Sequence, residues 1–269
     1  MAAISRIARE AIEVLGAERQ IVPFSMREAS FELADAYRVA AVVKAMREAR
    51  GERAIGRKIG FTNRTIWDQY DVHAPIWGYI YDTTVADLPR PGETASLTGL
   101  AEPRIEPEII FGLMRRPAPN MGAAALASCL DWVAHGFEVV QSIFPGWIFS
   151  PADTIAGYGL HGRLWIGPRH GFAQRASTFL KELTTFEIDL IEGGVQRDHG
   201  RAADVLDGPL FALLHLVKVL SVDEANPPLE AGEIVTTGTL TRAFPASSGQ
   251  SWRTRLHGLP LEDAEIAFA

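Results

Sequence analysis

The sequence predicts an α+β fold in which helices precede and surround a mixed β body. Two stretches with apolar residues at helical spacing lie before Gly51. After Gly51, short β-branched and aromatic runs alternate with glycine and proline, which is typical of strands and loops. Helices outside a strand-rich body are an α+β arrangement. We divide the chain into an N-terminal helical region, residues 1–55, and a core, residues 56–269.

The first helix is predicted over residues 4–16, where one apolar stripe recurs at helical spacing: Ile4, Ile7, Ala8, Ala11, Ile12 and Leu15. Pro23 breaks the pattern. Ser25 then opens a capping-box sequence, and Ser30 is an equally good N-cap for the next helix. That second helix is predicted to run to about residue 50, where Gly51 ends it.

The middle of the chain alternates helices and strands. Residues 123–134 look helical and lead into a strand that holds Glu138. A further helical stretch covers residues 172–183. Residues 185–190 alternate apolar and polar side chains as a half-buried strand does, and the pair Gly193-Gly194 is a hairpin signal.

The last part of the chain begins with an apolar helix over residues 209–220, with a proline in its first turn. Residues 234–240 and 253–268 are strand-like, with a turn near His257-Gly258. The pattern contains no internal repeat and no low-complexity tract.

Composition excludes several classes of protein. The formal net charge is −7, so the chain lacks the excess of basic residues that is typical of nucleic-acid-binding proteins. No stretch approaches the roughly 20 apolar residues that a membrane span needs. The N-terminus soon reaches Glu10 and Glu13, unlike a signal peptide. The single cysteine, Cys129, lies in an apolar run and reads as a core residue. We expect a cytoplasmic protein without nucleic-acid or membrane partners.

Three glutamates form the most informative pattern. Glu106 and Glu108 are two residues apart in an extended segment, so their side chains point to the same face. Adjacent carboxylates repel unless a cation or protons share them. Glu138 lies in an apolar run, where an unpaired charge is costly. Three carboxylates without a Cys or His pattern suit Mg²⁺ or Mn²⁺ rather than zinc. The alternative is a strand with Glu106 and Glu108 on its solvated face.

Lys58 lies between Gly56 and Gly60 and next to Ile59. Desolvation there would favour loss of its proton, as a general base requires. The alternative is a surface lysine on a glycine-rich turn. Further along, residues 153–162 are small and flexible and include Tyr158 and His161, which are possible acid/base groups.

These segments together carry a resemblance. Gly56-x-Lys58-x-Gly60-x-Thr62, Arg104–Phe111 and Phe137–Ser142 occur in this order, followed by Asp153-x-Ile155-Ala156 with Arg163, Asp207–Leu210 and Gly238–Thr241. The chain resembles the 2-keto-4-pentenoate hydratase and 4-oxalocrotonate decarboxylase branch of the fumarylacetoacetate hydrolase superfamily. The resemblance covers roughly residues 30–269, and the motifs are specific only in combination.

The resemblance implies a mixed β-roll or barrel core with an N-terminal helical region and peripheral helices. It also implies a Mg²⁺ or Mn²⁺ ion held by Glu106, Glu108 and Glu138, a 2-keto acid substrate, and a proton-transferring Lys58. We assign substrate binding to five further residues: Trp77, Gln141, Ser142, Arg163 and Thr241. Superfamily members usually assemble, so we expect a homo-oligomer.

Three departures from the family pattern concern the pocket. Ile76 occupies a position where relatives usually carry an acid, two residues before Gly78. Gln141 replaces the aspartate of a Glu-x-x-Asp-Ser motif. The stretch 157–163 replaces Asp-Asn-Ala-Ser-Ser-Ser-Arg with bulkier, less polar residues. The group that activates water is therefore open, with Tyr158 and His161 as candidates.

Three functions remain. The first is a metal-dependent lyase that acts on a 2-keto acid or 2-hydroxydienoate, as a hydratase or else as a decarboxylase, in the catabolism of aromatic or related compounds. The second is a hydrolase of the C–C bond of acylpyruvates, in which an aspartate would more often be the third metal ligand than Glu138. The third is a non-catalytic partner subunit, against which the retained carboxylates and Lys58 argue.

Overall fold

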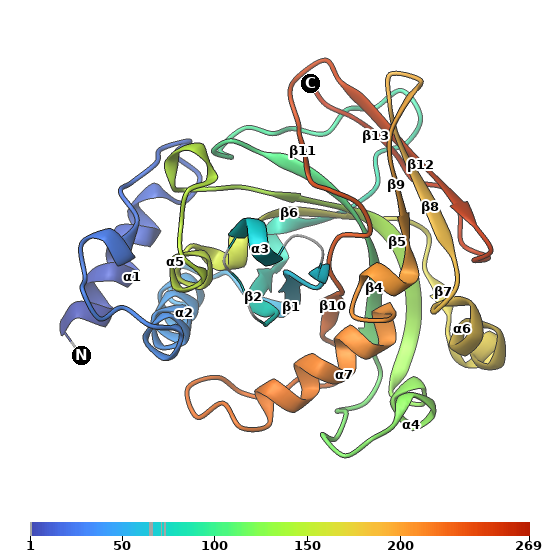
Figure 1. Ribbon diagram of the computed structural model, residues 1–269, viewed down its shortest axis with the longest axis horizontal. Helices are drawn as coiled ribbons and strands as arrows, with labels where there is room; N and C mark the ends of the chain where they lie inside the picture. The colour runs from blue at the N-terminus through green and yellow to red at the C-terminus, as the bar shows by residue number, and fades with distance from the viewer. Residues whose placement is uncertain (1, 65–66, 71, 73) are drawn as a thin grey trace.

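The computed structural model describes residues 2–64, 67–70, 72 and 74–269, and within these ranges it confirms the α+β prediction. A large sheet with the strand order β2-β1-β10-β4-β5-β6-β3 curls around the centre of the molecule, and a smaller sheet, β13-β12-β8-β9, packs beside it (Figure 1). The strands of the large sheet are β1 (Ala54–Gly60), β2 (Ile76–Tyr81), β3 (Val85–Asp87), β4 (Arg104–Leu113), β5 (Leu130–Val140), β6 (His161–Ile166) and β10 (Ile234–Thr236), with β7 (His170–Gly171) and β11 (Phe244–Pro245) attached to it.

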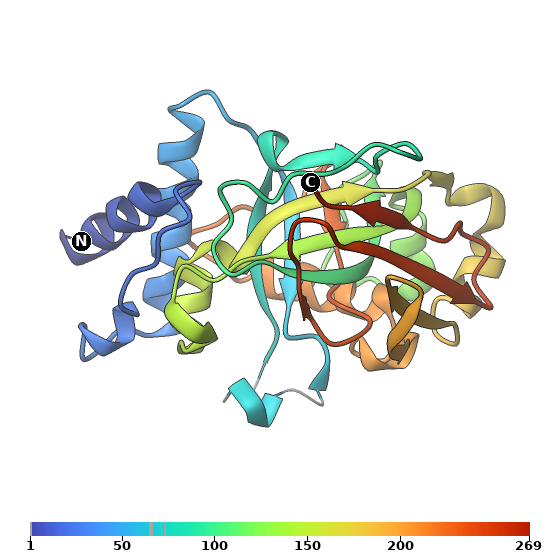
Figure 2. The same cartoon turned by 90° about the horizontal axis from the view of Figure 1, so that it is seen from above.

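The N-terminal region consists of α1 (Ala2–Val14) and α2 (Leu33–Glu48), which lie together at one end of the molecule (Figure 2). The predicted caps of the second helix are wrong. Ser25 lies in a short 3₁₀ helix, and the N-cap of α2 is Glu32, which makes no side-chain capping bond. The first strand begins at Ala54, close to the boundary that we predicted after residue 55.

The helices share a hydrophobic cluster with segments that come later in the chain. Ile7 and Ile12 of α1 and Val39 of α2 are buried together with Ile143 and Ile155. Ile155 belongs to α5 (Pro151–Ala156), which packs against both N-terminal helices. The helical region is therefore packed onto the core through an apolar interface of its own.

The main core lies between the large sheet and the helices that cover it. The apolar helix predicted over residues 209–220 is confirmed as α7 (Pro209–Leu220), which buries Leu213 and Leu216. The predicted stretch 172–183 becomes a 3₁₀ turn followed by α6 (Ala176–Glu182). The prediction of a helix over residues 123–134 is wrong in its second half. The helix α4 ends at Ala127, and β5 begins at Leu130, where pairing with β4 overrides local preference.

The second sheet contains β8 (Glu187–Glu192), β9 (Val195–Arg201), β12 (Ser251–His257) and β13 (Glu265–Ala267). The Gly193-Gly194 turn joins β8 to β9 as predicted, with both glycines at positive φ. The strand predicted over residues 234–240 is shorter than expected, because β10 ends at Thr236 and the chain then leaves the ladder. Among the described helices, including α3 (Trp67–Tyr70), none combines the length and apolar character of a membrane span.

The burial of Phe111 leads to a stability prediction. Phe111 is fully buried in β4, with its ring edge-on to Phe172. Phe111→Ala should lower the free energy of unfolding by about 3–5 kcal/mol, because it leaves a cavity in a packed core. Phe211→Ala on exposed α7 surface is the matched control, with a change within about 0.5 kcal/mol. Urea unfolding measures both, and equal effects would contradict the assignment of the core.

Candidate active site

The three predicted glutamates meet on two neighbouring strands. Glu106 of β4 is directly opposite Glu138 of β5 in the antiparallel ladder, and Glu108 follows Glu106 by two residues on the same face. One carboxylate oxygen of each residue lies within 4.8 Å of those of the other two. The register of one strand pair therefore brings together three carboxylates that are up to 32 residues apart in sequence, from 106 to 138.

The chemistry of this cluster fits a hard divalent cation. Glu108 and Glu138 are both fully buried, where uncompensated charge is costly. Oε2 of Glu108 accepts a hydrogen bond from the backbone N–H of Gly238 at 2.8 Å. Oε1 of Glu108 is buried and has no hydrogen-bond donor among the described residues. A carboxylate oxygen without a donor, facing two other carboxylates, is what a bound cation would satisfy.

Gly238 is required at this position for two reasons. Its φ is +102°, a conformation that residues with a side chain rarely adopt. A Cβ atom added to it would lie 1.8 Å from Oγ1 of Thr62. The glycine thus lets the loop after β10 place a backbone donor against Glu108, which explains why the Gly238–Thr241 motif accompanies the carboxylates.

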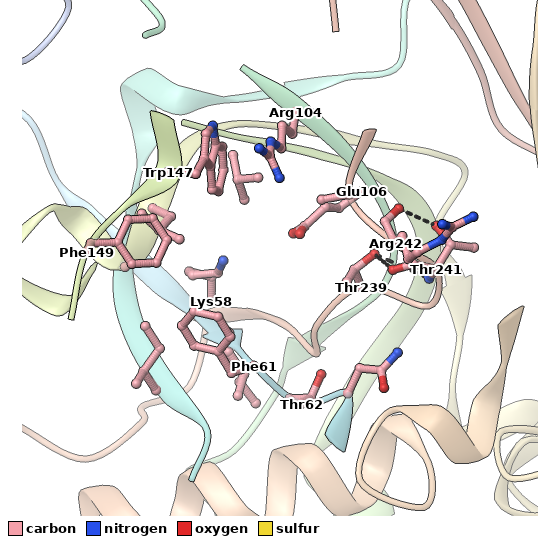
Figure 3. A pocket seen from close by; sticks show the side chains of 18 residues that line it. Lys58, Phe61, Thr62, Arg104, Glu106, Trp147, Phe149, Thr239, Thr241 and Arg242 are labelled. Atoms are coloured by element: carbon pink, nitrogen blue, oxygen red, sulfur yellow. Dashed lines mark hydrogen bonds between the residues drawn. The ribbon is translucent and has the colours of Figure 1, made fainter. Parts of the chain in front are cut away.

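Lys58 lies beside the cluster on the central strand β1, between β10 and β2. Its side chain is 3% exposed, and its Nζ lies 3.5 Å from Oε2 of Glu138. Thr236 of β10 contacts the same carboxylate oxygen at 3.5 Å. The alternative of a surface lysine on a turn is therefore wrong. Figure 3 shows Lys58 and Glu106 reaching into the same cavity.

The electrostatics of the metal-free cluster follow from burial and from these contacts. Burial alone would lower the pKa of Lys58, but the three carboxylates outweigh it and hold that pKa above its ordinary value. Burial raises the pKa of Glu106 to about 7. Burial and the neighbouring Glu138 charge raise the pKa of Glu108 well above its ordinary range. Burial opposes ionisation of Glu138, yet Lys58 and the His161 hydrogen bond hold its pKa low.

A cavity of about 260 Å³ opens above this cluster (Figure 3). One part of its wall is apolar and largely aromatic: Phe61, Ile76, Val140, Trp147, Phe149 and Leu160. The polar side chains of its wall are Lys58, Thr62, Asn63, Arg104, Glu106, Thr239, Thr241 and Arg242. Glu106 and Lys58 thus line a pocket with both charged and hydrocarbon surfaces, and Glu108 and Glu138 adjoin Glu106 within the cluster.

Two arginines line the cavity, and they differ in their partners. Arg242 is hydrogen-bonded to Asp198 at 3.1 Å. Arg104 lies over the Trp147 ring, with its Cζ 4.1 Å from the ring centroid, and no carboxylate in the described part of the chain hydrogen-bonds to it (Figure 3). Arg104 is half-buried and two residues from Glu106 on β4. A guanidinium held on an aromatic face in this way is ready to bind a carboxylate.

The cavity wall also contains strained backbone. Phe61, Trp147 and Leu160 all have positive φ, at 54°, 59° and 63°. Residues with side chains adopt this conformation at a cost and do so most often at functional sites. Gly159, at φ 62°, packs against Gly78 and Lys58. A Cβ atom added to either glycine would lie within 3.0 Å of the backbone around the other glycine. This close approach seats the turn after α5 beside the lysine.

Of the five residues predicted to bind substrate, Thr241 lines the cavity. The side chains of the other four are engaged elsewhere. Trp77 stacks on Tyr37 in the hydrophobic core, and Gln141 accepts from the backbone N–H of Ala101. Ser142 donates to the carbonyl of Phe144, and Arg163 donates to the carbonyl of Thr98. These four predictions are corrected: each side chain satisfies backbone groups or packs in the core.

The two predicted acid/base candidates are also turned away from the cavity. The Tyr158 hydroxyl donates to the carbonyl of Ala11 in α1, and its ring belongs to the cluster under the N-terminal helices. His161 is buried behind Glu138, with Nδ1 2.7 Å from Oε1 of that residue. Tyr158 is therefore corrected to a packing role, and His161 contacts a metal-ligand candidate rather than the space for substrate.

Sequence reasoning missed most of the cavity wall. Arg104 was detectable, because it lies two residues before Glu106 and so shares its face of the strand. Thr239 lies in the Gly238–Thr241 motif, whereas Trp147 and Phe149 carried no such signal. They come from loops whose approach to the cavity depends on tertiary packing.

Comparisons with known proteins agree with this geometry. No protein-family model matches the chain. The chain is 29% identical over 250 residues to 2-hydroxyhexa-2,4-dienoate hydratase of Comamonas testosteroni, covering 92% of this chain and 91% of the relative. It is 28% identical over 229 residues to 4-oxalocrotonate decarboxylase of Pseudomonas sp. strain CF600, covering 84% and 82%.

Solved structures show the same fold. The 4-oxalocrotonate decarboxylase of Pseudomonas putida G7, complexed with magnesium and adipate, has a TM-score of 0.88 at 24% identity and covers 99% of this chain and 97% of its own. The fumarylpyruvate hydrolase of Pseudomonas aeruginosa, in complex with Mn²⁺ and pyruvate, has a TM-score of 0.59 at 12% identity and covers 80% and 89%. The predicted resemblance and the fumarylacetoacetate hydrolase type of fold are confirmed.

The raised pKa of Glu106 predicts how metal affinity depends on pH. Below about pH 7 the metal-free carboxyl of Glu106 holds a proton that a cation must displace. Affinity for Mn²⁺ should therefore fall as the pH falls through 7, with a slope that approaches about tenfold per pH unit at lower pH, since a proton is released when the ion binds. Titration calorimetry from about pH 6 to 8 measures this slope. Glu106→Gln is the control, and an affinity independent of pH in the wild-type protein would contradict the prediction.

Proposed function

We propose that this protein is a divalent-metal-dependent lyase that acts on a 2-keto acid or 2-hydroxydienoate, as a hydratase of the 2-keto-4-pentenoate type, in the catabolism of aromatic or related compounds. The observation that carries the proposal is the cluster of Glu106, Glu108 and Glu138 beside Lys58, from which Glu106 and Lys58 reach the wall of one cavity. Relatives named as hydratase and decarboxylase, which align with most of the chain, support it.

The residues that would hold Mg²⁺ or Mn²⁺ are Glu106, Glu108 and Glu138. The magnesium and Mn²⁺ complexes of the two structural neighbours support this assignment. When bound, the cation supplies positive charge that stabilises the negative charge developing on the 2-oxo group of the substrate. The three carboxylates would hold it next to Lys58, whose side chain lines the cavity.

Lys58 is the proton-transfer group in this proposal. Its Nζ faces the cavity and lies within 3.5 Å of Glu138, so it can reach a substrate held next to the carboxylates (Figure 3). From this position the amine can move protons between C3, C5 and the keto oxygen of a 2-hydroxydienoate. The turn at Gly159 packs against its stem, because a Cβ added to that glycine would lie 3.3 Å from Cδ of Lys58.

Arg104 and Thr241 are the groups that we propose for substrate binding. Arg104 presents its guanidinium from the Trp147 face, where it can bind a carboxylate of the acid substrate. Thr241 lines the same cavity next to Thr239, whose hydroxyl bonds to the Thr241 carbonyl at 2.8 Å. The aromatic wall would receive the hydrocarbon part of the substrate.

Ile76 favours decarboxylation as the second candidate reaction. In the cavity this side chain lies beside Gly60, close to Lys58, at the position where relatives usually carry an acid. Among the described lining residues, Lys58 and Glu106 are then the titratable groups other than the two arginines. Addition of water needs a group that activates it, whereas loss of CO₂ requires one proton donor and is aided by an apolar wall.

Two further functions have less support. An acylpyruvate C–C hydrolase would more often carry an aspartate as the third ligand, whereas this chain has Glu138 opposite Glu106. A non-catalytic partner subunit would have no use for three buried carboxylates beside a buried lysine.

A substrate panel tests the function. Purified protein with Mg²⁺ should convert a 2-hydroxydienoate to the hydrated 4-hydroxy-2-keto acid, or an oxalocrotonate to CO₂ and a dienoate, with products identified by mass. Glu108→Gln should bind the cation far more weakly and abolish turnover while keeping the fold, because it removes one anionic ligand. Circular dichroism checks the fold. Turnover of acylpyruvates alone, or full activity of Glu108→Gln, would contradict the proposal.

The role of Lys58 has its own test. Lys58→Met keeps most of the packing volume and removes the proton carrier. It should leave Mn²⁺ binding intact and reduce kcat by about 10²-fold or more, the usual scale for a general acid/base. Near-normal kcat in this variant would assign proton transfer to another group.

We further propose that the protein is a homo-oligomer, as superfamily members usually are. Light scattering should give a mass of at least twice the 29.4 kDa of one chain. A mass near that of one chain over a wide concentration range would contradict this. The cytoplasmic location and the absence of nucleic-acid and membrane partners stay predictions from the sequence.

A further inference from the structure

His161 lies between one of the three carboxylates and a threonine from another segment. Its Nδ1 is 2.7 Å from Oε1 of Glu138, and its Nε2 is 2.8 Å from Oγ1 of Thr84. The threonine is held in turn by Tyr81: its Oγ1 accepts from the backbone N–H of that residue at 3.3 Å, which leaves the hydroxyl proton for donation to Nε2. The histidine side chain is 1% exposed. Both ring nitrogens are therefore engaged by fixed partners, without access to bulk water.

The local backbone explains why this side chain reaches Glu138. Strands β5 and β6 pair regularly from Gly136 to Val139, and then the register shifts so that Val140 is opposite His161. Such a bulge turns a side chain toward the other face of the strand. Gly162 makes the bulge possible, because a Cβ there would lie 2.5 Å from the carbonyl oxygen of Val139. The pair His161-Gly162 thus places an imidazole against Glu138.

The two carboxylate oxygens of Glu138 contact different neighbours. Oε1 faces His161, while Oε2 faces Lys58 and Thr236, each at 3.5 Å. With both oxygens engaged, the carboxylate has one orientation. Like Glu138, His161 is absent from the described cavity wall, so its ring contacts the carboxylate and does not line the substrate space.

We propose that His161 is a positioning residue: together with Thr84 it clamps Glu138 in the orientation that binds the cation and faces Lys58. This inference rests on the proposed metal-dependent function and adds a residue outside the three carboxylates to the proposed site. For a carboxylate to accept from the ring, Nδ1 must carry the proton. The hydrogen bond fixes the ligand as outer-shell partners of metal ligands generally do.

The test measures Mn²⁺ binding to metal-free protein by titration calorimetry, without substrate. His161→Leu removes the donor and should weaken binding by about 10–100-fold. His161→Asn is the matched control, since its amide nitrogen can occupy the place of Nδ1, and it should recover most of the affinity. Thr84→Val keeps the histidine but frees its ring, and should weaken binding in the same direction by a smaller factor. Thermal unfolding of each metal-free variant checks the fold.

Several outcomes would overturn the clamp. Wild-type affinity in folded His161→Leu would do so, and so would an Asn variant as weak as the Leu variant at equal stability, which would indicate a space-filling role. If His161→Leu does not fold, unchanged affinity in folded Thr84→Val overturns the proposal.

A measurement without metal completes the test. Nitrogen-15 NMR of the metal-free protein should show a proton on Nδ1 of His161, and a bare Nδ1 would contradict the clamp. Failure of the wild-type protein to bind Mn²⁺ at all would instead overturn the proposed metal-dependent function, so the two failures are distinguishable.

Discussion

The mutual repulsion of three buried carboxylates is the constraint on which the rest of this structure depends. Glu106, Glu108 and Glu138 lie on one face of a strand pair, two of them without solvent contact. Without compensation their charges would oppose folding, because burial and like charge both disfavour ionisation. Lys58 supplies one buried positive charge, and protons shared by the cluster reduce the rest. A divalent cation replaces those protons, which links metal binding to both stability and pH.

The strands and loops around the three carboxylates hold them in place. The central strands β1, β10, β4 and β5 are neighbours, so the lysine and the carboxylates are placed by backbone ladders instead of mobile loops. The loop after β10 adds a backbone donor through Gly238, and the bulge at Gly162 adds an imidazole behind Glu138. Precise placement on strands, with a second layer of hydrogen bonds, is what a metal site with an open face requires.

The charged and apolar parts of the cavity wall come from different kinds of chain segment. Its charged end is built on strands, whereas its apolar side comes from segments such as those of Phe61, Trp147 and Leu160, all with positive φ. A strand scaffold that keeps the chemistry constant, with loops that vary the wall, allows related chains to accept different acids. In this chain Ile76 and the aromatic side chains make the wall less polar near Lys58, which favours a substrate with a hydrocarbon segment and reactions that need few proton carriers.

The sequence by itself predicted the fold class, and through the family resemblance it pointed to the three carboxylates and Lys58. The i, i+2 spacing of Glu106 and Glu108 specifies a shared face in any strand, and the stripe of α1 specifies a buried face in any helix, so local periodicity suffices. It could not place Tyr158, Trp77, Gln141, Ser142 or Arg163, whose residue types suit a pocket as well as a core. Tertiary structure decided these positions, because a turn at Gly159 sends the Tyr158 hydroxyl to α1 and a register shift sends His161 to Glu138. Side-chain direction at a turn or bulge depends on backbone pairing between distant segments, and no local pattern encodes that pairing.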